Sequence, residues 1–188
     1  MRKFSHEELL KQRESRFRFP FCAVLNNIRS LYNVGSLFRT ADGAGLEKLW
    51  LCGITGIPPS PQISKTALGA EKSIPWEFHA RARNCIEHLK AEGWQIVLLE
   101  QTPQSLPYSE FCPKERVCLV VGNEVSGVEE DLLPLCDQAI EIPMSGLKIS
   151  LNVAVAFGIA AYHIQHSLRS FHARFSATKM ADRRESAC

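Results

Sequence analysis

Three short polar segments, each next to an apolar run, hold the residues of this chain best suited to chemistry. In the first, 33–41, Asn33 is a suitable helix N-cap, and Gly35 and Arg39 are four positions apart and share one helix face. A glycine beside an arginine leaves room for a large group, such as a phosphate gripped by two parallel hydrogen bonds. An exposed arginine with a glycine for close packing explains the same pattern, so this segment alone is weak evidence.

The second segment, 117–127, is a strand-like apolar run that opens into a polar turn containing Glu124. Ser126 and Glu129 fit a capping box for a following helix, whose first turn carries further acidic residues. Carboxylates at a helix start disfavour phosphate, so this loop suits a cationic ligand better. From its position alone, Glu124 is equally well explained as an ordinary exposed loop acid.

The third segment, 142–152, is a strand end, a glycine-containing loop and the start of a very apolar helix expected over 150–168. Ser150 is a plausible N-cap for that helix. Asn152 is a short polar side chain within the apolar helix, so it needs a partner in the protein or in a ligand. A helix that is apolar on almost all sides must be covered from several directions, and a second subunit is a natural source of that cover.

The elements around these segments predict an α/β fold with a mostly parallel sheet flanked by helices, because short apolar runs alternate with helix-length stretches. Strands are expected at 21–25, 48–52, 95–100, 117–122 and 139–142, and helices at 5–16, 33–44, 81–92, 126–135 and 150–168. Ligands of such folds bind at the carboxyl ends of the strands. The loops 26–33, 122–127 and 143–150 are therefore expected to meet there.

Composition favours one cytoplasmic domain without metal. The 188 residues hold no apolar run long enough to span a membrane, and the seven cysteines include no Cys-x-x-Cys pair, which indicates reduced thiols. His163 and His166 are three apart, but no third ligand accompanies them. The usual glycine-rich dinucleotide and nucleoside-triphosphate loops are absent from the sequence.

The excess of positive charge is concentrated at the two ends of the chain, although the net charge of the whole chain is only +2. Residues 1–20 hold six Lys or Arg against three Glu, and residues 167–188 hold five against two acids. We expect a short basic N-terminal extension over 1–20 and a basic C-terminal tail over 167–188 that can be flexible. Basic ends fit contact with a polyanion, and merely solvated termini explain the charge equally well.

Taken together and in this order, the three segments resemble the three motifs of the SpoU/TrmH family of RNA ribose 2′-O-methyltransferases, in the SPOUT superfamily. The resemblance runs from about Phe21 to about His166, and it rests on Asn33-Val-Gly with Arg39, on Gly122-Asn-Glu, and on Ile142-Pro-Met with Ser150-Leu-Asn. It implies a methyltransferase domain over 21–166 with a C-terminal trefoil knot, assembled as a homodimer.

The resemblance also implies a cofactor and a set of site residues. S-adenosyl-L-methionine would be bound by Leu99, Gly122, Ile142, Met144, Ser150 and Leu151. The catalytic residues would be Arg39, Asn33, Glu124, Ser150 and Asn152. RNA would be contacted by Arg39 and by Lys65, which lies in a segment, 64–71, that also resembles a loop of this family.

The sequence therefore predicts methyl transfer to a ribose 2′-hydroxyl of tRNA or rRNA. A guanidinium is effectively never deprotonated, so Arg39 is expected to hold the phosphate beside the target ribose, and either that phosphate or Glu124 to accept the proton. The alternatives are a SPOUT-fold RNA-binding protein without catalysis that acts in ribosome assembly, methylation of a base, and a small-molecule α/β enzyme. The intact motif residues speak against the first, the Asn33 to Arg39 motif against the second, and the basic ends against the third.

Overall fold

The computed structural model describes the backbone of residues 18–185 and the side chains of residues 18–170. The helix expected over 5–16 and most of the basic N-terminal extension lie outside this part of the chain. The strands are β1 (Phe19–Asn26), β2 (Leu46–Cys52), β3 (Trp76–His79), β4 (Gln95–Leu99), β5 (Leu106–Pro107), β6 (Val117–Val121) and β7 (Gln138–Glu141). The α-helices are α2 (Leu31–Ala44), α3 (Pro61–Ala67), α4 (Ala82–Ala91) and α5 (Val153–Glu185).

The strands form one parallel sheet in the order β3-β2-β1-β6-β4-β7-β5. The predicted α/β fold with a parallel sheet is thereby confirmed. All five expected strands are present, within two residues at each end. The short strands β3 and β5 were not expected, because neither carries a continuous apolar run.

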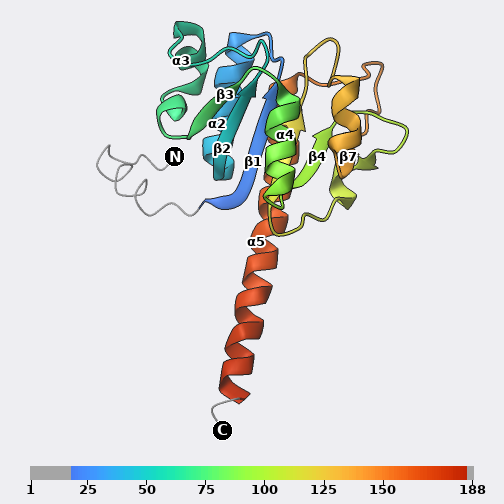
Figure 1. Cartoon of the computed structure of the whole chain (residues 1–188). Coiled ribbons are helices and arrows are strands. Elements are labelled where there is room, and N and C mark those ends of the chain that lie inside the picture. Colours follow the sequence, from blue (N-terminus) through green and yellow to red (C-terminus); the bar gives the residue numbers. More distant parts are fainter. Residues whose placement is uncertain (1–17, 186–188) are drawn as a thin grey trace.

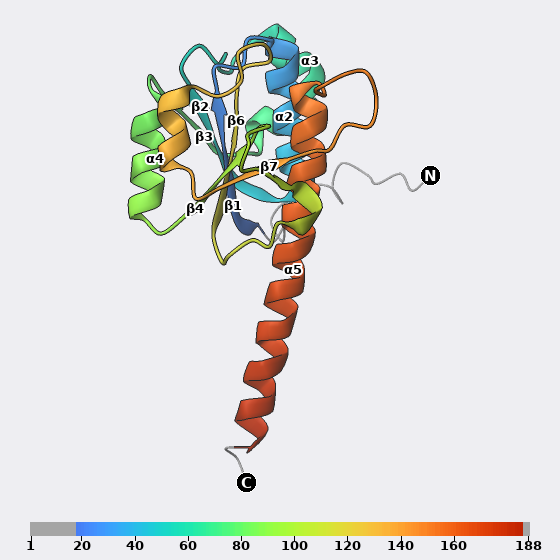
Figure 2. The same ribbon diagram turned by 90° about the vertical axis from the view of Figure 1, so that its right-hand side faces the viewer.

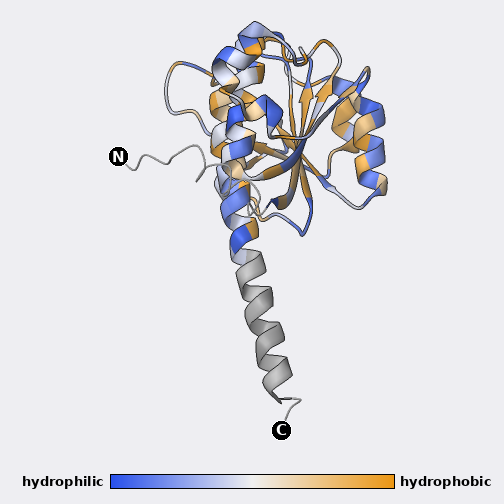
Figure 3. Cartoon of the chain, turned by 90° about the vertical axis from the view of Figure 1, so that its left-hand side faces the viewer, coloured by the Kyte–Doolittle hydropathy of each residue, from blue (hydrophilic) through white to orange (hydrophobic). Residues whose placement is uncertain are grey.

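Helices cover both faces of the sheet (Figures 1 and 2). One face packs against α2 and α5 through a cluster that includes Phe38, Phe157 and Ile164, all fully buried. The other face packs against α4 and the 3-10 helix η3 (Glu130–Leu135) through a cluster that includes Ile86 and Leu132. The hydropathy colouring shows apolar strands between helices whose outer surfaces are hydrophilic, as expected for a buried parallel sheet (Figure 3).

Two helix expectations were wrong. The stretch 126–135 forms no α-helix, only η3, and Pro134 lies inside it and supplies no backbone N–H for a continuing helix. The last helix begins at Val153 rather than at residue 150 and continues to Glu185, well past Leu168. The C-terminal part of this helix extends away from the sheet and the other helices (Figure 1).

The described start of the chain belongs to the fold. Arg18 donates hydrogen bonds to the carbonyls of Leu46, at 2.6 Å, and Ser73, at 2.8 Å.

No helix within residues 18–185 combines the length and the apolar character needed to cross a membrane. The trefoil knot concerns how the chain is threaded, which strand order does not decide, so it stays a prediction.

Candidate active site

The site lies at the carboxyl edge of the sheet, where four neighbouring strands end. β1, β6, β4 and β7 are consecutive in the sheet, so the loops that follow them meet there, as the sequence predicted. Asn123, just after β6, donates a 2.8 Å hydrogen bond from Nδ2 to the carbonyl of Asn27, just after β1. This bond joins two of the three loops that were expected to meet, 26–33 and 122–127.

A chain of hydrogen bonds joins one residue from each segment. Nδ2 of Asn152 donates to Oδ1 of Asn33 at 3.2 Å, and Nδ2 of Asn33 donates to Oε1 of Glu124 at 2.8 Å. Glu124 also accepts the backbone N–H groups of Arg29, at 3.0 Å, and Ser30, at 3.2 Å. The carboxylate is therefore fixed by donors from the β1–α2 connection.

The residues that cap α2 and α5 orient these side chains. They are Ser30 and Asn152, whereas the sequence suggested Asn33 and Ser150. Ser30 is the N-cap of α2 and accepts the N–H of Asn33, so the Asn33 side chain is free to reach Glu124. At the start of α5, Oδ1 of Asn152 accepts the N–H of Ala154 at 2.9 Å. Asn152 thus takes the capping role expected of Ser150, and its expected polar partner is Asn33.

The environment of Glu124 keeps it ionised. Partial burial favours its protonated form, but the hydrogen bonds from Asn33 and from the backbone of Arg29, Glu124 and Ser30 outweigh this, and the pKa of Glu124 is lowered from 4.5. A carboxylate with a lowered pKa and several donors is a good positioning group and a weak proton acceptor.

A cavity of about 260 Å³ adjoins this chain of hydrogen bonds. Glu124 lies in its wall, together with all six residues expected to bind the cofactor, which are Leu99, Gly122, Ile142, Met144, Ser150 and Leu151. The residues Glu100, Gln101 and Glu141 also line it, and they were not among the residues expected from the sequence. The signal for them was their position, because Glu100 and Gln101 directly follow β4 and Glu141 ends β7.

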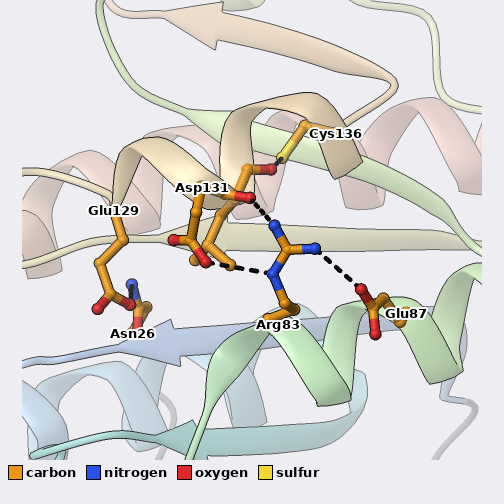
Figure 4. A network of polar contacts seen from close by, with 7 residues as sticks. Asn26, Arg83, Glu87, Glu129, Asp131 and Cys136 are labelled. Carbon is orange, nitrogen blue, oxygen red and sulfur yellow. Dashed lines mark hydrogen bonds and ion pairs between the residues drawn. The ribbon is translucent and has the colours of Figure 1, made fainter.

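The acidic residues 129–131, at the start of η3, do not line this cavity. The expected capping box is not formed: the N–H of Ser126 instead donates to Oδ1 of Asn123 at 3.1 Å. Glu129 accepts a 3.1 Å hydrogen bond from the buried Asn26, and Asp131 pairs with Arg83 at 3.2 Å (Figure 4). The carboxylates that face the cavity are Glu100, Glu124 and Glu141.

Part of the cavity wall is backbone at close approach. A Cβ on Gly122 would overlap the backbone of Gly127, which pairs with Asn123 through two 3.0 Å backbone hydrogen bonds. Gly127 has φ of 70°, a conformation that favours glycine. The turn therefore presents peptide groups rather than side chains at this point, which suits a large flat ligand.

Arg39 lies outside the cavity, on the exposed side of α2. Within residues 18–170 its guanidinium has no hydrogen-bond or ion-pair partner. The expectation that Gly35 leaves room for a ligand was wrong. Gly35 is buried, and a Cβ there would overlap Thr66 Oγ1 and the carbonyl oxygen of Ile63, so the glycine serves the packing of α3 on α2.

The remaining candidates do not line the cavity. His163 bonds the carbonyl of Phe111 through Nε2 at 3.0 Å and packs edge-on against Tyr108. In the described part of the chain, no three His, Cys, Asp or Glu side chains are grouped so that they could hold a metal ion. Lys65 is exposed on α3, with Nζ 5.8 Å from the ring centre of Tyr32.

Comparison with known proteins places this site in a family. The chain is 28% identical over 144 residues to the tRNA (guanosine(18)-2′-O)-methyltransferase of Escherichia coli (strain K12), covering 75% of this chain and 61% of that protein. It is 35% identical over 142 residues to the 23S rRNA (guanosine(2553)-2′-O)-methyltransferase RlmP of Bacillus subtilis (strain 168), covering 76% of this chain and 56% of that protein. The chain thus matches less than two thirds of the length of these two relatives.

Solved structures agree. The A. aeolicus TrmH/SpoU tRNA modifying enzyme superposes with a TM-score of 0.79 at 27% identity, covering 88% of this chain and 85% of that one. The AdoMet-bound rRNA methyltransferase from Sinorhizobium meliloti superposes with a TM-score of 0.74 at 30% identity, covering 79% of this chain and 56% of that one. The sequence profile of the SpoU rRNA Methylase family matches residues 20–162, so this chain belongs to that family.

Proposed function

We propose that this protein transfers a methyl group from S-adenosyl-L-methionine to a ribose 2′-hydroxyl of tRNA or rRNA. The observation that carries the proposal is the hydrogen-bonded chain Asn152–Asn33–Glu124 beside a cavity lined by every residue expected to bind the cofactor. The two relatives are guanosine 2′-O-methyltransferases of tRNA and of 23S rRNA, which supports the same reaction.

The cavity fits this cofactor chemically. Leu99, Ile142 and Met144 supply apolar surface for an adenine, and the turn at Gly122 supplies backbone groups at close range. Glu100, Glu124 and Glu141 give the wall a negative charge that complements a positively charged sulfur. When bound, the cofactor supplies a methyl group on a sulfonium, which a ribose oxygen can attack without a metal.

Arg39 is proposed to position the RNA. Its guanidinium is exposed, unpaired among the described residues and outside the cavity, so it is available to a phosphate rather than to the cofactor. A fixed phosphate places the neighbouring ribose, and alignment of two bound partners lowers a barrier by roughly 7–11 kcal/mol. Lys65 on α3 would hold a further phosphate.

Glu124 is proposed to orient the β1–α2 connection and the loop after β6 rather than to act as the base. Its pKa is lowered, and its oxygens already accept hydrogen bonds from Arg29, Ser30 and Asn33. The proton of the 2′-hydroxyl becomes strongly acidic as its oxygen gains a methyl group. A weak acceptor within hydrogen-bond reach therefore suffices, and the phosphate held by Arg39 provides one.

The assembly and the ends of the chain belong to the same proposal. Val155 is 52% and Tyr162 50% exposed on α5. Because they are seven positions apart, they lie on the same side of the helix and form an exposed apolar stripe that can pack against a second copy. We propose a homodimer that acts in the cytoplasm without metal, with a methyltransferase domain over 21–166. The basic ends, 1–20 and 167–188, would add RNA contacts.

The experiment has two parts, both done with the full chain. Calorimetric titration with S-adenosyl-L-methionine in the presence of a chelator should show binding. Incubation with cofactor and total RNA from cells that lack the gene should then restore a 2′-O-methyl mark, located by resistance of one linkage to alkali. Binding without any transfer would favour a non-catalytic RNA-binding protein, and a mark on a base would contradict ribose transfer.

A further inference from the structure

Tyr32 is an exposed aromatic side chain directly beside the proposed active site. It precedes Asn33 on the first turn of α2, and it is 48% exposed. Neither hydrophobic cluster formed by residues 18–170 includes it. A tyrosine that adds little to the core and faces solvent next to a site for RNA has a ring available for stacking.

A cation lies near this ring because α3 is packed against the start of α2. Nζ of Lys65 lies 5.8 Å from the centre of the Tyr32 ring. The position of α3 relative to Tyr32 is fixed, because Thr66 Oγ1 donates a 2.9 Å hydrogen bond to the Tyr32 carbonyl and α3 packs closely over Gly35. The fold therefore keeps the backbone of Lys65 close to the ring, so that the lysine side chain and the ring can act on the same ligand.

The pair continues along α2 to Arg39. Tyr32, Ser36 and Arg39 are spaced by four and three positions and so lie on one side of the helix, about 10 Å from first to last. Neither Lys65 nor Arg39 has an ion-pair partner in the described part of the chain. An aromatic ring flanked by free cations is the combination that binds single-stranded nucleic acid, with bases on the ring and phosphates on the cations.

We infer that Tyr32 is a stacking platform for the base of a nucleotide next to the target ribose, with Lys65 on that nucleotide's phosphate. The inference rests on the proposed function and adds a residue that selects for unpaired RNA. A base can reach an exposed ring only when it is free of its helix, so this site would favour loops over duplexes.

The test uses the full chain and a short single-stranded oligouridylate that carries one 2-aminopurine, whose fluorescence falls when it stacks and whose uridine neighbours stack on it only weakly. Tyr32→Ala should weaken binding about 5- to 150-fold and abolish the quenching, because base stacking on an aromatic ring is worth that much. Tyr32→Phe should retain both. Leu133→Ala is the control for loss of an exposed apolar side chain, since Leu133 is 40% exposed on η3, which packs on the opposite face of the sheet from α2.

The salt dependence of RNA affinity distinguishes the contribution of the Tyr32 ring from that of the Lys65 charge. Lys65→Ala should reduce the slope of log affinity against log salt by about 0.7, whereas Tyr32→Ala should leave the slope unchanged. Equal affinity and equal quenching for the parent and Tyr32→Ala would overturn the platform. Failure of the parent to bind S-adenosyl-L-methionine would count against the proposed function instead, so the two failures are distinguishable.

Discussion

Nδ2 of Asn33 donates a 2.8 Å hydrogen bond to Oε1 of Glu124, a residue 91 positions further along the chain. This bond links the start of α2 to the loop after β6, and Asn152 extends it to the start of α5. Because Glu124 holds Arg29 and Ser30 by their backbones as well, the geometry of three loops depends on one ionised carboxylate.

Asn33→Asp should place two carboxylates at this contact. At about pH 8 we expect transfer to fall roughly 10- to 100-fold, as loss of a charged hydrogen bond predicts. As the pH falls toward about 5, activity should partly recover, because repulsion raises the pKa of one carboxyl until the pair shares a proton. Initial rates of methyl transfer across this range measure the effect.

The parent provides the reference for that profile. Its Glu124 has a lowered pKa and so stays ionised above 4.5, and it should add no inflection between about pH 5 and pH 8. The double variant Asn33→Asp with Glu124→Gln restores the bond with reversed polarity and should regain part of the rate at pH 8. A single variant that is equally impaired at every pH would contradict this account.

Arg39→Ala should abolish transfer and leave the affinity for S-adenosyl-L-methionine nearly unchanged, since Arg39 lies outside the cavity. Arg39→Lys keeps the charge but loses the planar fork, and a misplaced phosphate should cost about 100-fold in rate. Rates at several pH values and calorimetry together measure this. A lysine variant as fast as the parent, with a rate that climbs above neutral pH, would instead indicate that residue 39 acts as a base.

Gly35→Ala should destabilise the fold, because its Cβ would overlap the backbone carbonyl of Ile63, which cannot rotate away. We expect the free energy of unfolding in urea to fall by about 1–3 kcal/mol, as overpacking does. Gly146→Ala is the control, because no atom lies within 4 Å of a Cβ built there. Equal stability of the two variants would show that α3 moves freely on α2.

Val155→Glu should convert the proposed dimer to a monomer, since it places a charge in the apolar stripe of α5. Sedimentation at micromolar protein should show the parent at twice the mass of the variant. Leu133→Glu is the control, because Leu133 is 40% exposed on η3, which packs on the opposite face of the sheet. A parent that sediments as a stable, active monomer would refute the dimer.

The sequence by itself determined the fold class and the strands that build the site, and its resemblance to a family named six of the residues that line the cavity. Runs such as Val117–Val121 are apolar at every position, which is stable only in a sheet covered on both faces, so these strands were predictable. The polar residues that follow such strands meet at one edge in any parallel sheet. The places of Glu124, Met144 and Ser150 therefore followed from the sequence pattern and the family resemblance.

Only the tertiary structure decided what each polar group binds. Ser30 rather than Asn33 caps α2, because Asn33 has a stronger partner in Glu124, far away in the sequence. Gly35 faces α3 instead of a ligand. Glu129 binds Asn26 and Asp131 binds Arg83, while Glu100 and Glu141 face the cavity. These choices are competitions between partners distant in sequence, and local spacing carries no information about which partner the folded chain brings within 3 Å.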